Sequence, residues 1–198
     1  MSSTVALLKR EHTLQAFHCA FGCALGRFVR DRRGISAVEF AIVLPFMVAL
    51  YAGSIEFGEG LSTEYKATLA ARTVADIASQ YVSIDAPTMT SILGAASTVM
   101  TPYSANNMTV VLSEVTTDAK GHGTITWSAA QNGNAHTVGQ AVALPADLQI
   151  PSISLLWGEV TYPYTPSVGY IATGTISLYE TQYFYPRLST CVSFGGAC

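Results

Sequence analysis

The chain has 198 residues, of which 49% are hydrophobic and 12% are charged, and its formal net charge is −3. This composition disfavours a wholly soluble protein and favours a membrane segment joined to one modest domain. Residues 1–34 hold six basic and two acidic residues, a charge of +4, whereas the remainder holds four basic and eleven acidic residues, a charge of −7. Nucleic-acid binding is disfavoured because the arginines border an apolar span, where basic residues meet anionic lipid.

Residues 1–34 are predicted to form a basic cytoplasmic leader. Within it, residues 16–28 are apolar at helical spacing, but they are too short to span a membrane and lack the order of a cleavable secretory signal. An amphipathic helix on the inner membrane face and a discarded leader both fit this pattern. Cys19 and Cys23 have the spacing of half a zinc site, and because no second half follows, no metal is expected.

Residues 35–60 are predicted to form a transmembrane helix. Residues 40–55 contain no charge, and about 20 apolar residues cross the ~30 Å of hydrocarbon in a bilayer. Pro45 lies inside this helix, where it removes one backbone hydrogen bond and is expected to cause a mild kink. The basic residues before the span predict a cytoplasmic N-terminus, so the chain after about Gly58 is expected outside.

Glu39 is out of place in such a helix, because an unpaired carboxylate at the bilayer centre costs about 2.5–3.5 kcal/mol. It follows Ile35 by four residues, about 6 Å along a helix. Cleavage before Ile35 would create an amino group that could pair with Glu39 of the same or a neighbouring subunit and so lower the cost of burial. In a plain signal anchor, Glu39 would instead lie among the lipid headgroups.

The motif around Glu39 reads RG at 33–34, AVEFA at 37–41 and LP at 44–45. It resembles the start of the TadE-like family, the minor pilins (pseudopilins) of the tight-adherence, or Flp-type, pilus, and the resemblance covers about residues 32–75. It implies cleavage by a prepilin peptidase between Gly34 and Ile35, with Gly34 letting the backbone enter the protease cleft. Glu39 and Phe40 would then be the fifth and sixth residues of the mature chain and serve processing or assembly.

Residues 61–102 are predicted to form a helical connector. An apolar stripe is expected to continue the membrane helix to about residue 81 and to cover a sheet. Asp85 predicts the N-cap of a second helix over residues 88–100, with Pro87 in its first turn and Pro102 beyond its end. The residues of the stripe are Leu61, Tyr65, Leu69, Val74, Ile77 and Tyr81.

Residues 103–198 are predicted to form a β-rich extracytoplasmic head. Strands are expected over residues 108–116 and 123–129, whereas residues 151–168 are expected to be mostly loop with one short strand near Val160. Residues 170–185 carry apolar side chains on both faces, as a central strand does. The predicted fold class is α+β: a long N-terminal transmembrane helix continues into an amphipathic helix, packed on an antiparallel sheet of three to five strands with a second short helix.

Cys191 and Cys198 lie outside in this topology, where a disulfide can persist. His122 lies in a Gly-His-Gly turn and His136 in a Gly/Asn-rich loop, and both are interpreted as solvated turn residues. The sequence contains no nucleophile motif, Walker loop or dinucleotide fingerprint. We therefore expect no enzyme activity, cofactor, nucleic acid or small-molecule substrate. The tyrosine-rich C-terminal part is expected to be either a contact surface or the core of the sheet.

The function that this resemblance implies is that of a TadE-like minor pilin in the assembly of a Flp-type pilus or a related secretion machine, acting in adhesion and biofilm formation. The implied location is the inner membrane, with a single pass, the N-terminus in the cytoplasm and the head outside. The implied partners are the prepilin peptidase, other pilus assembly subunits and minor pilins, and inner-membrane lipids. The alternative is an uncleaved, signal-anchored periplasmic protein that binds a ligand or supports the envelope.

Overall fold

The computed structural model describes residues 33–167, 174–196 and 198. The predicted leader with Cys19 and Cys23 lies outside these residues. The chain divides into two compact units, residues 1–51 and 52–198. Helix α2 (Arg33–Ser79) runs through the boundary between them.

The described part of the first unit is the beginning of α2. The helix continues through Pro45, and side chains from residue 34 to residue 50 are exposed on all sides. Its most apolar 18-residue window has a mean hydropathy of 2.0 and is not buried at all. By length and composition α2 can cross a membrane, which is consistent with single-pass anchoring.

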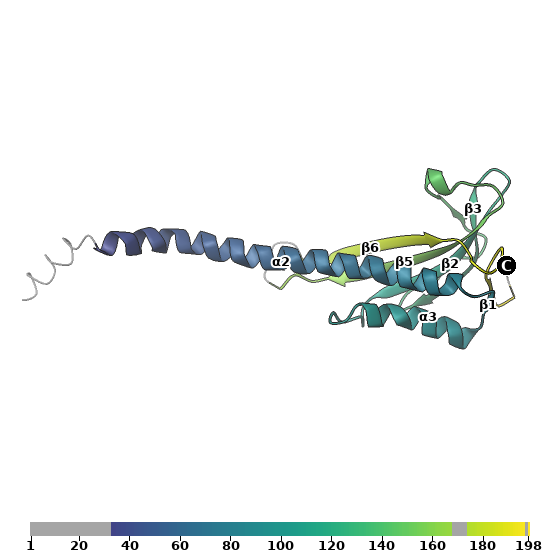
Figure 1. Cartoon of the computed structure of the whole chain (residues 1–198), viewed down its shortest axis with the longest axis horizontal. Helices are drawn as coiled ribbons and strands as arrows, with labels where there is room; N and C mark the ends of the chain where they lie inside the picture. The colour runs from purple at the N-terminus through teal and green to yellow at the C-terminus, as the bar shows by residue number, and fades with distance from the viewer. Residues whose placement is uncertain (1–32, 168–173, 197) are drawn as a thin grey trace, which may run out of the picture. The chain divides into compact units, whose positions relative to one another are not determined.

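The second unit is a five-stranded sheet with the later part of α2 and a second helix on one face (Figure 1). The strand order is β4-β3-β2-β5-β6 with every neighbouring pair antiparallel, and β1 pairs with β7 in a separate parallel ribbon. The α+β fold class is confirmed. In chain order the elements after α2 are β1 (Ser83–Ile84), α3 (Ala86–Val99), β2 (Thr109–Thr117), β3 (Gly123–Gln131), β4 (Ala141–Val142), η1 (Ala146–Leu148), β5 (Ser154–Tyr164), β6 (Ile176–Phe184) and β7 (Ser193–Phe194).

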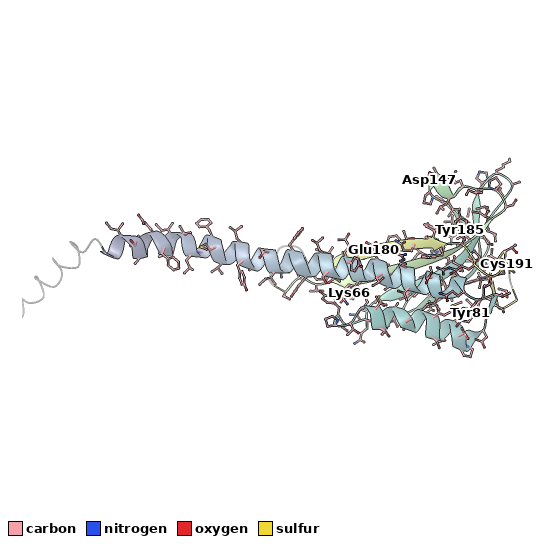
Figure 2. All side chains as sticks on the ribbon, in the orientation of Figure 1. Lys66, Tyr81, Asp147, Glu180, Tyr185 and Cys191 are labelled. Carbon is pink, nitrogen blue, oxygen red and sulfur yellow. A yellow bond between two sulfur atoms is a disulfide. The ribbon has the colours of Figure 1, made fainter. Side chains whose placement is uncertain are left out.

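Helix α3 begins as the sequence predicts. The Asp85 side chain accepts a hydrogen bond of 2.9 Å from the backbone N–H of Thr88, and Pro87 occupies the first turn. Interaction with the Thr88 side chain, followed by this backbone hydrogen bond, lowers the pKa of Asp85, because both stabilise the carboxylate. The Lys66 ammonium of α2 then donates to the carbonyl oxygens of Val99 and Thr101 at the other end of α3, at 3.3 and 2.5 Å (Figure 2).

The face of α2 that packs on the sheet differs from the predicted apolar stripe. Of the six predicted residues only Val74 is fully buried and Ile77 partly so. The helix approaches the sheet through small side chains, because Gly158 of β5 lies directly beneath Ala71 and leaves no room for larger ones. Leu61, Tyr65, Leu69 and Tyr81 of the predicted stripe are exposed, and the buried face of α2 consists of Thr63, Ala67, Ala70, Ala71, Val74, Ala75, Ala78 and Ser79.

The predicted length of the strand near Val160 and the predicted central place of the strand over residues 170–185 are wrong. Residues 154–164 form β5, an eleven-residue strand that lies between β2 and β6 in the sheet. Only a short strand was expected there. Pro163 lies near its end, where the ladder to β6 continues opposite Ser177. The strand predicted over residues 170–185 is β6, and it lies at the edge of the sheet. Its two apolar faces contact the helix on one side and the aromatic side chains of β5 on the other.

Hydrophobic side chains cover both faces of the sheet. On the helix side, Leu112, Leu156 and Val160 pack against α2 and α3. On the outer side, Val115 and Leu155 pack beneath the chain that connects β3 to β5. That connection contributes Val142, Leu144, Leu148 and Ile153 to the outer cluster.

Candidate functional site

The predicted processing motif lies on the described part of α2 that precedes the second unit. Gly34 and Ile35 are both helical residues of α2. A Cβ placed on Gly34 would meet no other atom within 4 Å, and the Ile35 side chain is exposed. Within the described residues, the space around Gly34 is therefore open and the Ile35 side chain is accessible.

Glu39 and Phe40 lie one turn further along the same helix. Both side chains are exposed. Glu39 is the first of four glutamates on α2 before Lys66, and residues 34–65 contain no lysine or arginine. Within residues 34–65, therefore, this carboxylate has no cationic side chain to pair with in hydrocarbon, and a free amino group at residue 35 would lie about 6 Å away along the axis.

A groove lies in the second unit, between α2 and the neighbouring ends of two strands, where β5 ends at Tyr164 and β6 begins at Ile176. Its volume is about 380 Å³. Burial, with the charges of Glu59 and Glu56 as smaller contributions, raises the pKa of Tyr164 above its ordinary value. The lining residues are Glu56, Phe57, Gly60, Leu61, Glu64, Tyr164, Pro166, Ile176 and Leu178.

Residues 34–76 match the family described as TadE-like protein. This match confirms the resemblance over the segment in which the sequence motif lies. No curated protein and no solved structure gives a significant match to the chain. The remaining residues, 77–198, lie outside the family match, so the comparisons say nothing about the head.

The TadE-like segment begins at the glycine of the motif and ends on the buried face of α2. Its first residue is Gly34, and its last residues include Val74 and Ala75, which are fully buried beneath the head. The match therefore covers the apolar helix together with the part that carries the head. Glu39, Phe40 and Pro45 all lie within it.

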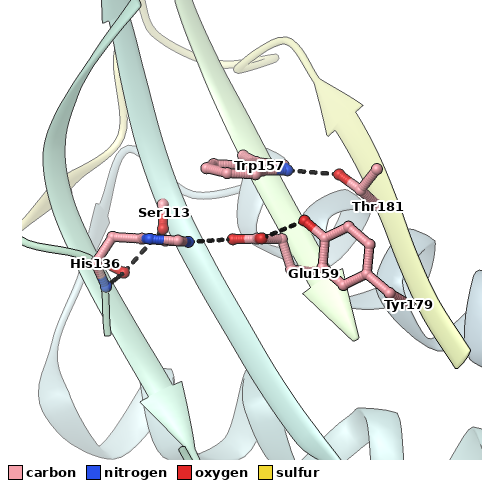
Figure 3. A network of polar contacts seen from close by, with 7 residues as sticks. Ser113, His136, Trp157, Glu159, Tyr179 and Thr181 are labelled. Atoms are coloured by element: carbon pink, nitrogen blue, oxygen red, sulfur yellow. Dashed lines mark hydrogen bonds and ion pairs between the residues drawn. The ribbon is translucent and has the colours of Figure 1, made fainter. Parts of the chain in front are cut away.

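Beyond the TadE-like segment, a polar network crosses the outer face of the sheet (Figure 3). The imidazole Nε2 of His136 lies 2.6 Å from a carboxylate oxygen of Glu159 on β5. The hydroxyl of Tyr179 on β6 donates to the other oxygen at 2.5 Å. Burial, followed by this contact with Glu159, raises the pKa of Tyr179 above its ordinary value.

The same network contains a row of stacked rings. His136 stacks on Trp157 with ring centroids 4.9 Å apart, and Trp157 stacks on Tyr183 at 5.9 Å. The indole N–H of Trp157 donates to the Thr181 hydroxyl at 2.5 Å. These contacts hold the segment after β3 on the outer face of the sheet, so the interpretation of His136 as a solvated turn residue is wrong.

His122 behaves as the sequence predicts. It lies at the tip of the β2–β3 hairpin with its side chain 73% exposed and 3.0 Å from Asp118. Hydrogen bonds from the backbone N–H groups of His122 and Lys120 lower the pKa of Asp118, because they stabilise its charged form.

Within the described residues, no group of three or more His, Cys, Asp or Glu side chains is positioned to hold a metal ion.

A buried carboxylate anchors the C-terminal segment to the sheet. Glu114 of β2 is fully buried and accepts hydrogen bonds from the indole N–H of Trp127 at 2.7 Å and from the backbone N–H of Val192 at 2.9 Å. Desolvation raises the pKa of Glu114, and these donors oppose that effect. In the structure Cys191, next to Val192, is joined to Cys198 by a disulfide with the Cα atoms 5.8 Å apart.

Sequence reasoning missed Glu114 and Glu159. Each is the single acidic residue inside a run of apolar and small residues, VVLSEV in β2 and LLWGEV in β5. A charged residue in such a strand must be paired when it is buried. That pattern alone could have predicted that both glutamates are buried and hydrogen-bonded within the fold. It does not predict which residues bind them.

Proposed function

We propose that this chain is a minor pilin, or pseudopilin, of a tight-adherence (Flp-type) pilus, and that a prepilin peptidase cuts it between Gly34 and Ile35. The observation that carries this proposal is the family match, which begins at the glycine of the motif and covers the apolar helix. The open space around Gly34 and the exposed side chain of Ile35 support the proposed cleavage.

Each residue of the motif has a proposed role. Gly34 has no side chain, so the backbone on the leader side of the cut can enter a narrow protease cleft. Cleavage would free the amino group of Ile35. Glu39 would then pair with that group, in its own chain or in the next subunit, and set the position of one subunit against another. Phe40 would take part in the same recognition.

The proposed topology follows the charge and the apolar helix. The basic leader would stay on the cytoplasmic side of the inner membrane, and the head would lie outside. The role would be structural rather than catalytic, in assembling, initiating or stabilising the pilus or a related secretion machine. Contacts with other assembly subunits and minor pilins, and effects on adhesion and biofilm formation, would follow from that role.

The deciding experiment is the N-terminal sequence of the protein recovered from membranes of cells that express the pilus genes, with and without the peptidase. We expect a start at Ile35 that depends on the peptidase. Gly34→Val should abolish this start. Gly53→Val is the matched control, because it changes another glycine of α2 with open space around it.

An intact start in both strains would overturn the proposed processing. The chain would then be an uncleaved, signal-anchored periplasmic protein whose function lies in the head. Loss of the Ile35 start in the Gly53→Val control as well would show that the glycine substitutions act through insertion or folding, so the control must be processed normally for the result to count.

A further inference from the structure

The groove beside Tyr164 begins where the apolar run of α2 ends. The Tyr164 hydroxyl donates to the backbone carbonyl oxygen of Glu56 at 3.4 Å. Its ring lies against Gly60, where a Cβ would stand 3.7 Å from the nearest ring carbon. Glu56 is the first charged residue after the charge-free residues 40–55. These contacts place the end of β5 beside the first turns of α2 that follow the apolar run.

The groove therefore opens at the level of lipid headgroups when the apolar run of α2 crosses a bilayer. The polar layers add about 10–15 Å to the ~30 Å hydrocarbon core, or about 5–8 Å on each side. From Glu56 to Gly60 the helix rises about 6 Å. Lipid is thus the molecule that every anchored copy of the chain meets at the mouth of the groove.

Large apolar side chains line the groove at this level. Phe57 of α2 and Ile176 of β6 are 69% and 41% exposed, and Leu61 on the same lining is 51% exposed. Exposed apolar side chains that gather around a hollow mark a binding site. Contact with water at these side chains is unfavourable, whereas the acyl chain of a lipid would cover them.

The ionisable side chains on the lining favour a cationic group. Among the described residues that line the groove, Glu56 and Glu64 are acidic and none is basic. The ammonium of Lys66, the first lysine after them on α2, donates to carbonyl oxygens at the end of α3. Segments that bind anionic lipid at a membrane surface carry basic residues. This lining therefore disfavours an anionic headgroup and favours one that carries an ammonium group.

The groove presents apolar and acidic groups in the order in which a lipid presents its chain and its headgroup. Phe57 lies at the end nearer the apolar run, and the exposed Glu64 follows seven residues, or about 10 Å, further along α2. Strand β6 follows α2 in the same direction, from Ile176 in the groove to Glu180, whose carboxylate accepts a hydrogen bond of 2.9 Å from Thr68. An acyl chain fits the first end of the groove and an ammonium group the second.

We propose that the groove binds one zwitterionic aminophospholipid of the phosphatidylethanolamine type. The beginning of an acyl chain lies against Phe57 and Ile176, the ammonium group lies beside the Glu64 carboxylate, and the phosphate between them faces the water. The bound lipid covers side chains that the head leaves exposed and holds the β5–β6 end of the head at the membrane surface. This inference goes beyond the proposed role in a pilus. It rests on single-pass anchoring and is independent of cleavage after Gly34.

The test is quenching of tryptophan fluorescence by brominated lipid, with the full-length chain in vesicles. Phe57→Trp places the reporter on the groove lining. Leu69→Trp is the control, at an exposed position about 18 Å further along α2 and outside the lining. The signal of the natural Trp127 and Trp157 is measured on the unchanged chain and subtracted. The vesicles contain phosphatidylcholine with an equal minor fraction of either brominated phosphatidylethanolamine or brominated phosphatidylglycerol.

We expect brominated phosphatidylethanolamine to quench the reporter of Phe57→Trp at least about twofold more than brominated phosphatidylglycerol does. Neither lipid should quench the reporter of Leu69→Trp. Equal quenching of the first reporter by the two lipids would show contact with bulk lipid only and would overturn the proposal. Absence of quenching by both lipids would also overturn it, because the groove would then lie away from the bilayer or be covered by protein.

Second-site variants in the Phe57→Trp chain locate the lipid. Gly60→Leu fills the groove and should remove the preference for phosphatidylethanolamine, whereas Gly58→Leu changes a glycine with open space outside the lining and should retain it. Glu64→Gln should also remove the preference, whereas Glu59→Gln, at an exposed acid outside the lining, should retain most of it. A preference that survives either Gly60→Leu or Glu64→Gln would overturn the groove as the site.

These measurements are separate from the experiment on processing. A preference for phosphatidylethanolamine together with an intact N-terminus in cells would support the lipid site and contradict the cleavage. A peptidase-dependent start at Ile35 without any lipid preference would support the cleavage and contradict the lipid site.

Discussion

Gly158 of β5 lies so close to α2 that a Cβ at this position would stand 2.6 Å from the carbonyl oxygen of Ala71. A hydrogen in place of a methyl group is what allows the helix to lie on the sheet at this point. The contact explains why α2 buries alanines rather than its leucines and tyrosines. It also connects the TadE-like segment, which includes Ala71, to a head that lies outside the family match.

Gly158→Ala should therefore destabilise the head by about 1–3 kcal/mol, because the added methyl group overpacks a contact with rigid backbone. Gly94→Ala is the control. Gly94 lies on α3 with open space around it, so alanine there should be neutral or stabilise by up to about 1 kcal/mol. Urea unfolding of the full chain in detergent, followed by tryptophan fluorescence, measures both. Equal stability of the two variants would contradict the close contact.

Glu39→Ala should reduce processing or pilus assembly and leave membrane insertion nearly unchanged. The substitution removes the proposed partner of the Ile35 amino group, while an apolar residue is favoured in hydrocarbon. The measurements are the fraction of chain starting at Ile35, the number of pili per cell, and resistance of the anchored chain to alkaline extraction. Normal processing together with normal piliation would contradict the proposed role of Glu39 in setting the position of one subunit against another.

Glu114 should make the head less stable as the pH rises. Desolvation by burial raises its folded-state pKa above the ordinary value of a glutamate. The folded state therefore holds its proton more tightly than the unfolded state. The stability that Glu114 contributes is fully present below the unfolded pKa and is lost as the pH rises through the folded pKa.

Glu114→Gln should remove this pH dependence, because the amide cannot ionise. The difference in unfolding free energy between the natural chain and this variant should fall from pH 4 to pH 8, as measured by urea midpoints at each pH. Glu114→Ala should cost about 1–3 kcal/mol at pH 4, since the N–H of Val192 loses its acceptor, and the cost should fall as the pH rises. A difference that rises with pH would contradict the direction of the shift.

His136 and Tyr179 offer a graded test of the network around Glu159. His136→Phe preserves a ring on Trp157 and removes the contact with a carboxylate that is only 6% exposed, and we expect a cost of about 1.5–3 kcal/mol. Tyr179→Phe removes one hydroxyl donor and should cost about 0.5–1.5 kcal/mol.

Hydrogen exchange locates these effects. The His136 variant should lose protection in the segment after β3, which His136 ties to the sheet. The Tyr179 variant should leave that segment protected, because Tyr179 belongs to β6. Exchange that rises equally in both variants would show that the two residues act through general loosening of the sheet and not through separate contacts.

Local patterns were sufficient for helix α2, for the start of α3 and for the β2–β3 hairpin. The apolar run before Glu56 and the cap at Asp85 depend on neighbours in sequence, and helix α2 and the start of α3 follow from them. The β2–β3 hairpin was predicted for the same reason, since the turn and the Thr/Val-rich runs are adjacent. Residues 151–168 were misread because the three prolines there were weighed more heavily than the apolar run LLWGEV, which fills the centre of the sheet.

The sequence by itself determined the membrane-length helix, the likeness of residues 34–76 to the TadE-like family, and the α+β class, because composition and spacing along the chain carry that information. Only the tertiary structure decided which side of α2 meets the head. That choice depends on Gly158, 87 residues beyond Ala71 in the chain, since close packing of small residues is possible only where the opposite backbone leaves room. It likewise decided that His136 meets Glu159 and that the aromatic and leucine side chains of α2 remain exposed, because these contacts depend on segments that are distant in sequence.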